Sequence, residues 1–119
     1  MNKLLLADDS ELFYKFLRDV LKKEGIEIIW AKNKKEAIEK FKEEKPDIVL
    51  VDIILSDSNG IDVIKEIKAL DKDANIMVIS GLDKQDVIKE ALDAGARDYI
   101  VKNVSPKYFR EEILKALKT

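Results

Sequence analysis

Short apolar runs alternate along this chain with longer segments in which apolar residues recur every three or four positions. Runs of this length without regular polar alternation are typical of strands buried on both faces of a parallel sheet. Five such runs are present, at Lys3–Ala7, Ile26–Trp30, Ile48–Val51, Ile76–Ser80 and Asp98–Lys102. We therefore expect five short strands.

A segment with helical spacing follows each predicted strand. The apolar rows that define these five helices are Leu12, Phe13, Phe16, Leu17, Val20 and Leu21; Ala37, Ile38 and Phe41; Ile61, Ile64, Ile67 and Leu70; Val87, Ile88, Ala91 and Leu92; and Ile113, Leu114 and Leu117. Alternating strands and helices predict an α/β fold, in which a doubly wound parallel sheet carries helices on both faces.

Polar residues and glycines mark the ends of the helices. Asn33–Glu36 has the pattern of a capping box, and Ser105–Pro106 is a typical helix start. We expect Asp83 to cap the fourth helix and Gly95 to end it. A turn-rich loop, Asp57–Gly60, separates the third strand from the third helix.

The length of 119 residues fits one domain over residues 1–119, and no linker, repeat or attached output domain is expected. No apolar run approaches the length that spans a membrane, and the N-terminal segment lacks the pattern of a secretory signal. We therefore expect a cytoplasmic protein.

Abundant Lys and Glu with a single Gln favour a thermophilic source.

The composition excludes several chemistries. The chain has no Cys and no His, so thiolate catalysis, disulfides and imidazole ligands are absent. With 22 basic and 24 acidic residues the net charge is −2, which argues against nucleic acid or an anionic membrane as a partner.

Polar residues end most of the predicted strands. Asp8 and Asp9 follow the first, Asp52 follows the third, and Ser80 and Lys102 end the fourth and fifth. Parallel strands all point the same way, so these residues should meet at one edge of the sheet. Taken singly, each has an ordinary structural explanation in a helix cap, a turn or a solvated strand end. Their coincidence at matching strand ends favours a site.

Three carboxylates this close would repel one another unless a cation lay among them, and hard oxygen ligands suit Mg²⁺. A carboxylate beside Mg²⁺ and the Lys102 ammonium can accept a phosphoryl group, because that transfer depends mainly on positioning and charge neutralisation. Ser80, the metal and Lys102 would then bind the phosphoryl oxygens. The predicted chemistry is phosphoacceptance and not enzymatic turnover.

Nearly the whole chain resembles the receiver domains of two-component response regulators. The residues that carry the resemblance are the strand-end residues named above together with Gly60, Gly81 and Tyr99. The resemblance implies a flavodoxin-like strand order 2-1-3-4-5. It also implies phosphorylation of Asp52 by a sensor histidine kinase. Mg²⁺ would be held by Asp9, Asp52 and the backbone carbonyl of Ile54, and by Asp8 through water.

The resemblance further implies a switch. Ser80 would move towards the phosphoryl group and Tyr99 would turn inward, which would bias a protein-binding face formed by the fourth helix, fifth strand and fifth helix. The plainer alternative for Tyr99 is a half-buried aromatic residue with its hydroxyl in water. The downstream partner remains open among a motor protein, a His-containing phosphotransferase in a phosphorelay and the kinase itself.

Two positions depart from the family pattern, because Ser56 and Asn103 stand where receivers usually have Pro. A cis bond before a non-proline residue costs about 2.5–4 kcal/mol. We therefore expect the Lys102–Asn103 bond to be trans with a rearranged loop, in preference to a strained cis bond. If Lys102 lay far from Asp52, phosphoacceptance would be in doubt.

Two further interpretations follow from other features. The missing prolines motivate a degenerate receiver that acts only as a protein-interaction module without phosphorylation. A flavodoxin-like FMN carrier shares the expected sheet, but the acidic first loop at Asp8 and Asp9 does not suit a flavin phosphate, which requires hydrogen-bond donors.

Slow self-dephosphorylation is predicted from the apolar side chains of Ile54 and Leu82, two residues beyond Asp52 and Ser80. Neither side chain can orient an attacking water. The combined variant Ile54→Asn with Leu82→Glu should therefore lose its phosphoryl group faster than the wild type, as measured by phosphoprotein half-life. Equal half-lives would show that these side chains only pack at the rim.

Overall fold

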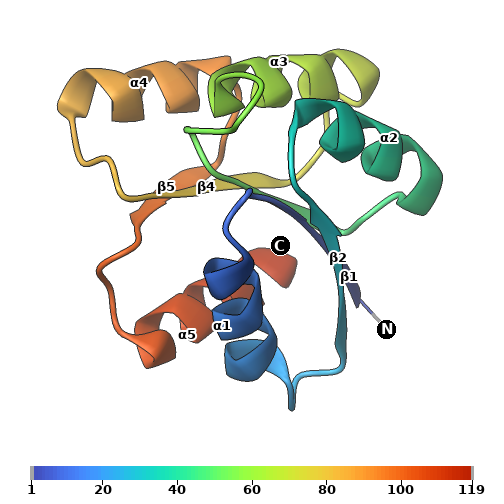
Figure 1. The fold of residues 1–119 in the computed structure, drawn as a ribbon, viewed down its shortest axis with the longest axis vertical. Coiled ribbons are helices and arrows are strands. Elements are labelled where there is room, and N and C mark those ends of the chain that lie inside the picture. The colour runs from blue at the N-terminus through green and yellow to red at the C-terminus, as the bar shows by residue number, and fades with distance from the viewer. Residues whose placement is uncertain (1, 119) are drawn as a thin grey trace.

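The computed structural model describes residues 2–118 as five parallel strands and five helices in strict alternation (Figure 1). The elements are β1 (Asn2–Ala7), α1 (Glu11–Leu21), β2 (Ile26–Ala31), α2 (Lys34–Glu44), β3 (Ile48–Val51), α3 (Gly60–Leu70), β4 (Ile76–Ser80), α4 (Gln85–Ala94), β5 (Asp98–Val101) and α5 (Pro106–Leu117). The strand order is β2-β1-β3-β4-β5, which confirms the predicted fold class and order.

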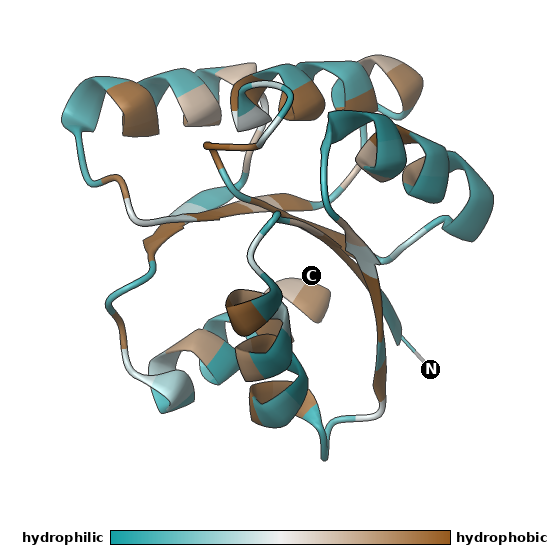
Figure 2. Cartoon of the chain, in the orientation of Figure 1, coloured by the Kyte–Doolittle hydropathy of each residue, from teal (hydrophilic) through white to brown (hydrophobic). Residues whose placement is uncertain are grey.

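The sheet separates two apolar layers. Helices α2, α3 and α4 cover one face, and α1 and α5 cover the other (Figure 1). Successive residues of β1 point to opposite faces, so Leu5 and Ala7 join the first layer while Leu4 and Leu6 join the second. The strands are accordingly the most continuously apolar part of the ribbon (Figure 2).

Complete burial of the central strands explains their unbroken apolar sequence. Every residue of β3 and β4 is buried, as are the last four residues of β1. The edge strand β2 is only partly covered.

None of the described helices combines the length and the continuous apolar sequence that crossing a bilayer requires.

Most predicted caps are confirmed. The Asn33 side chain accepts a hydrogen bond from the Glu36 N–H at 2.9 Å, and Ser105 caps α5 through the Tyr108 N–H at 3.1 Å. Gly95 ends α4 with a positive φ of 123°, a backbone conformation that glycine adopts readily.

The predicted Asp83 cap is wrong. Helix α4 starts one residue later, with Lys84 at the N-cap position and no capping side chain. The first turn still contains a carboxylate, that of Asp86. It accepts a hydrogen bond from the Val87 N–H at 3.0 Å. Asp83 and Asp86 both lie near this start, but neither side chain caps the helix, and the position of a helix start varies by one or two residues.

Some boundaries differ by a residue from expectation. Gly60 is the first residue of α3 and not part of the preceding loop, and Lys102 lies just beyond β5. Leu70, the last residue of the apolar row that predicted this helix, is the final residue of α3 and is 50% exposed.

Gly60 brings the start of α3 against the chain that leaves β3. Its N–H donates to the Ile53 carbonyl at 2.6 Å, and the side chain of Asn59 caps the helix through the Ile61 N–H. A Cβ at residue 60 would overlap the main-chain carbonyl of Asp52 and lie 2.9 Å from the Cα of Ile53. Only glycine permits this approach.

Substituting Gly60→Ala should therefore lower the free energy of unfolding by about 1–3 kcal/mol, because backbone atoms must move to admit the methyl group. Chemical denaturation measures this. Gly81→Ala is the matched control, since a Cβ at residue 81 meets nothing within 4 Å. Equal losses in the two variants would contradict the steric explanation.

Candidate functional site

The predicted site residues meet at the carboxyl edge of the sheet. Three of them, Asp8, Asp52 and Lys102, continue a strand by one hydrogen bond. Their N–H groups donate to the carbonyls of Ala31, Ala7 and Ser80, respectively, at 2.8–3.0 Å. The positions just past β1, β3 and β5 are therefore held nearly as firmly as the strands themselves.

Asp8 is the most enclosed member of the site, with no exposed surface. Its Oδ1 accepts a hydrogen bond from the Ser10 N–H at 2.9 Å, and its Oδ2 accepts one from Lys102 Nζ at 2.8 Å. A buried carboxylate needs such partners, because an unpaired charge is costly away from water.

Lys102 joins the two buried carboxylates. Its Nζ donates to Asp8 Oδ2 and also to Asp52 Oδ2, the latter at 3.2 Å. Burial alone would lower the pKa of Lys102, but the hydrogen bond to Asp8 and the charges of Asp52 and Asp8 outweigh it and raise the pKa above its ordinary value. Lys102 is therefore a lasting positive charge at neutral pH.

Asp52 lies at the centre of the edge and is only 8% exposed. Burial raises the pKa of its carboxyl group; Lys102 opposes this shift through its charge and hydrogen bond, and the Asp8 charge adds to it. The Ile54 N–H donates to Asp52 Oδ1 at 3.4 Å. Asp52 thus keeps one oxygen at Lys102 and the other on the side of the β3–α3 loop.

The donor set fits a hard divalent cation. Carboxylate oxygens of Asp8, Asp9 and Asp52 all lie within 4.8 Å of one another, and Asp9 is exposed while the other two are buried. Oxygen ligands with one side open to water match the preference of Mg²⁺ for a few carboxylates and several waters. This is the acidic triad typical of a receiver metal site.

Ser80 and Tyr99 are linked through Leu82. The buried Ser80 hydroxyl accepts a hydrogen bond from the Leu82 N–H at 3.2 Å, and the Tyr99 hydroxyl donates to the Leu82 carbonyl at 2.8 Å. Burial raises the pKa of Tyr99, and the Ser80 hydroxyl opposes the shift only in part. Tyr99 is half-buried, as the plainer alternative expected, and its hydroxyl also has a protein hydrogen-bond partner.

The two departures from the family pattern do not displace Lys102. Among the described residues no peptide bond is cis, so the Lys102–Asn103 bond is trans, as preferred. Lys102 nonetheless reaches Asp52, because its own N–H donates a hydrogen bond to the Ser80 carbonyl.

Ile54, at the rim of the site, is 61% exposed.

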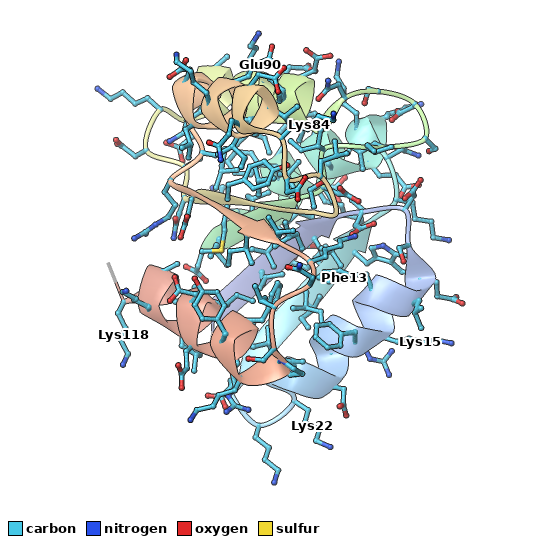
Figure 3. The ribbon with its side chains drawn as sticks, turned by 90° about the vertical axis from the view of Figure 1, so that its left-hand side faces the viewer. Phe13, Lys15, Lys22, Lys84, Glu90 and Lys118 are labelled. Carbon is cyan, nitrogen blue, oxygen red and sulfur yellow. The ribbon has the colours of Figure 1, made fainter. Side chains whose placement is uncertain are left out.

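Two aromatic residues contact the site without having been predicted to do so. The Phe13 ring of α1 lies 4.4 Å from Lys102 Nζ, at the junction of α1 with the segment that joins β5 to α5 (Figure 3). The Trp30 indole N–H donates to the Asp8 carbonyl at 2.7 Å. Both read in the sequence as ordinary apolar positions, and no local signal distinguished them.

Comparison with known proteins finds extensive similarity. The family model described as response regulator receiver domain matches residues 4–114. The proteins named chemotaxis protein CheY from Thermotoga maritima and Bacillus subtilis are 43% and 37% identical over 117 residues, covering 98% of this chain and 98% of each relative.

Comparison with solved structures also finds response regulators of the same fold. A CheY-like receiver domain protein from Methanospirillum hungatei has a TM-score of 0.93 at 26% identity, covering 99% of this chain and 94% of that one. A response regulator from Burkholderia pseudomallei, solved with a phosphorylated aspartic acid and a calcium ion, has a TM-score of 0.86 at 31% identity, covering 100% and 68%.

Removing the Asp52 charge should stabilise the metal-free protein. The pKa of Asp52 is raised in the folded state, so its contribution to stability is greatest at low pH and is lost as the pH rises through the folded pKa. Asp52→Asn should therefore raise the melting temperature by a few degrees at pH 7, and by less at pH 4.

Asp57→Asn is the matched control for this measurement. The hydrogen bond from the Lys34 N–H lowers the pKa of Asp57, so this carboxylate contributes stability at neutral pH that is lost on acidification. Its replacement should give no gain at pH 7. A melting temperature for Asp52→Asn at or below that of the wild type at pH 7 would contradict the assigned electrostatics.

Proposed function

Because this chain belongs to the family of response regulator receiver domains, we propose that residues 1–119 form one receiver in which Asp52 accepts a phosphoryl group from a sensor histidine kinase. A receiver is a phosphoacceptor and not an enzyme of the usual kind. The observation that carries the proposal is the nearly buried Asp52 carboxylate beside a protonated Lys102 and a second acidic residue.

In the transfer step an Asp52 oxygen forms a bond to phosphorus while the bond from phosphorus to the histidine nitrogen breaks. The electron pair of the broken bond stays with the imidazole. Lys102, already 3.2 Å from Asp52, would hold a phosphoryl oxygen with its ammonium. Such positioning and charge neutralisation are the main contributions a protein makes to phosphoryl transfer.

Asp9, Asp52 and the backbone carbonyl of Ile54 would hold Mg²⁺ directly, and Asp8 through water. When bound, Mg²⁺ would neutralise the charge of the carboxylates and of the incoming phosphoryl oxygens. The spacing of the carboxylate oxygens supports this assignment. So does the related response regulator from Burkholderia pseudomallei, which was solved with a phosphorylated aspartic acid and a calcium ion.

The contacts around Leu82 support a route from the site to the surface. If Ser80 turns to donate its hydroxyl to a phosphoryl oxygen, the Leu82 N–H loses its acceptor. The Leu82 carbonyl also holds Tyr99, so a shift of this residue changes the position of the Tyr99 ring. Phosphorylation would in this way bias the face built from α4, β5 and α5.

The surface beside Lys102 offers a place for the phosphodonor. A hollow of about 500 Å³ is lined by Ser10, Leu12, Phe13, Phe16 and Lys102, and Leu12 is 80% exposed. An apolar patch that reaches Lys102, the partner of Asp52, suits a helical kinase segment that carries the phosphohistidine. Downstream, the similarity to chemotaxis proteins favours a cytoplasmic protein target or a phosphotransferase over DNA.

The test is intact-mass spectrometry after incubation with Mg²⁺ and acetyl phosphate. The wild type should gain one phosphoryl group, and the adduct should be absent without Mg²⁺ and absent from Asp52→Asn. Asp93→Asn is the matched control, because this exposed carboxylate pairs with Lys89 on the surface of α4 and with no other cation among residues 2–118. It should be phosphorylated like the wild type.

If the wild type gains no adduct under conditions that label another receiver, the chain is instead an interaction module that works without phosphorylation. An adduct retained by Asp52→Asn would place the acceptor elsewhere and overturn the assignment of Asp52.

A further inference from the structure

Trp30 is the only tryptophan of the chain and lies near the end of the edge strand β2. Its ring stacks on Tyr14 of α1, with centroids 4.5 Å apart and planes inclined by 11°. Lys32 Nζ lies 4.9 Å from the same ring. Contacts from α1 and from Lys32, the residue just past β2, therefore fix the direction in which the indole N–H points.

That N–H is directed at the main chain of the acidic pocket. Trp30 Nε1 donates to the Asp8 carbonyl at 2.7 Å, and the next residue, Ala31, accepts the Asp8 N–H at 3.0 Å. Two consecutive residues of β2 thus bind both main-chain polar groups of Asp8. The Asp8 side chain is held separately by Ser10 and Lys102.

The Asp8 carbonyl belongs to the peptide plane that joins Asp8 to Asp9, so fixing the carbonyl also fixes the N–H and Cα of Asp9. Asp9 is exposed, and within residues 2–118 no group donates a hydrogen bond to its carboxylate. The position of the Asp9 carboxylate near Asp8 and Asp52 is therefore set by its main chain and by the torsion angles of its own side chain, without help from a hydrogen-bond donor.

We propose that Trp30 is a positioning residue for the divalent-cation pocket, acting by fixing the Asp8–Asp9 peptide plane so that the Asp9 backbone is already placed for its carboxylate to bind the cation. The inference rests on the proposed metal site. It assigns to a residue of β2, two strands away from β3, a share of the cation affinity. Groups that orient metal ligands typically contribute 10–100-fold to affinity.

Trp30→Phe tests this, because phenylalanine keeps a ring for stacking on Tyr14 and removes only the N–H donor and the second ring. Isothermal titration with MgCl₂ should give a dissociation constant about tenfold higher than that of the wild type. Phe41→Leu is the control: this half-buried aromatic residue of α2 packs against the core, away from the pocket. It should lose stability without losing Mg²⁺ affinity.

The two proposals fail in distinguishable ways. If the wild type and Trp30→Phe bind Mg²⁺ with equal affinity, the positioning role of Trp30 is overturned and the proposed metal site is retained. If the wild type itself shows no saturable Mg²⁺ binding, both proposals are overturned. A weakening by Phe41→Leu equal to that by Trp30→Phe would show that general destabilisation, and not the hydrogen bond, lowers the affinity.

A second measurement uses the unaltered protein, should Trp30→Phe fail to fold. The chain has a single indole N–H, so one NMR resonance reports its hydrogen bond to Asp8. That resonance should shift on addition of MgCl₂ with the dissociation constant found by calorimetry. A resonance that does not move at saturating Mg²⁺ would overturn the coupling between Trp30 and the pocket.

Discussion

The ammonium of Lys102, placed between the carboxylates of Asp8 and Asp52, is the interaction on which the rest of the site depends. Parallel strands gather acidic residues at one edge, and their mutual repulsion limits how closely they can lie. The positive charge of Lys102, the residue just past the last strand, offsets that repulsion without filling the open side near Asp9. The pocket is thus held in shape while it stays open to a cation.

The sheet makes this arrangement rigid. The buried strands β3 and β4 leave little freedom at their ends, and one additional ladder hydrogen bond extends that order to Asp52 and Lys102. The close approach of Gly60 to the Asp52 main chain closes the β3–α3 loop from the other side. A preorganised pocket of this kind can neutralise phosphoryl charge without first rearranging.

The neighbouring surface is held more lightly. Helix α4 begins without a capping side chain, and the segment before it is joined to the site through the contacts of Leu82 with Ser80 and Tyr99. Single hydrogen bonds contribute about 0.5–1.5 kcal/mol each, so a ligand that competes for Ser80 can change this balance. A rigid pocket beside a lightly held helix is the combination that a phosphorylation switch requires.

The sequence pattern by itself determined the five strands, the five helices, their alternation along the chain and the set of residues at the carboxyl edge, while the strand order 2-1-3-4-5 followed from the resemblance to receiver domains. Apolar runs, helical spacing and strand-end polar residues are local patterns, which can be recognised in the sequence without knowledge of tertiary contacts. It did not reveal that Lys102 stays in place without a following proline, that α4 starts after Asp83, or that Phe13 and Trp30 touch the site. Those outcomes depend on atoms distant in sequence, such as Trp30 and Asp8, which only the packing of β2, β1 and α1 brings together.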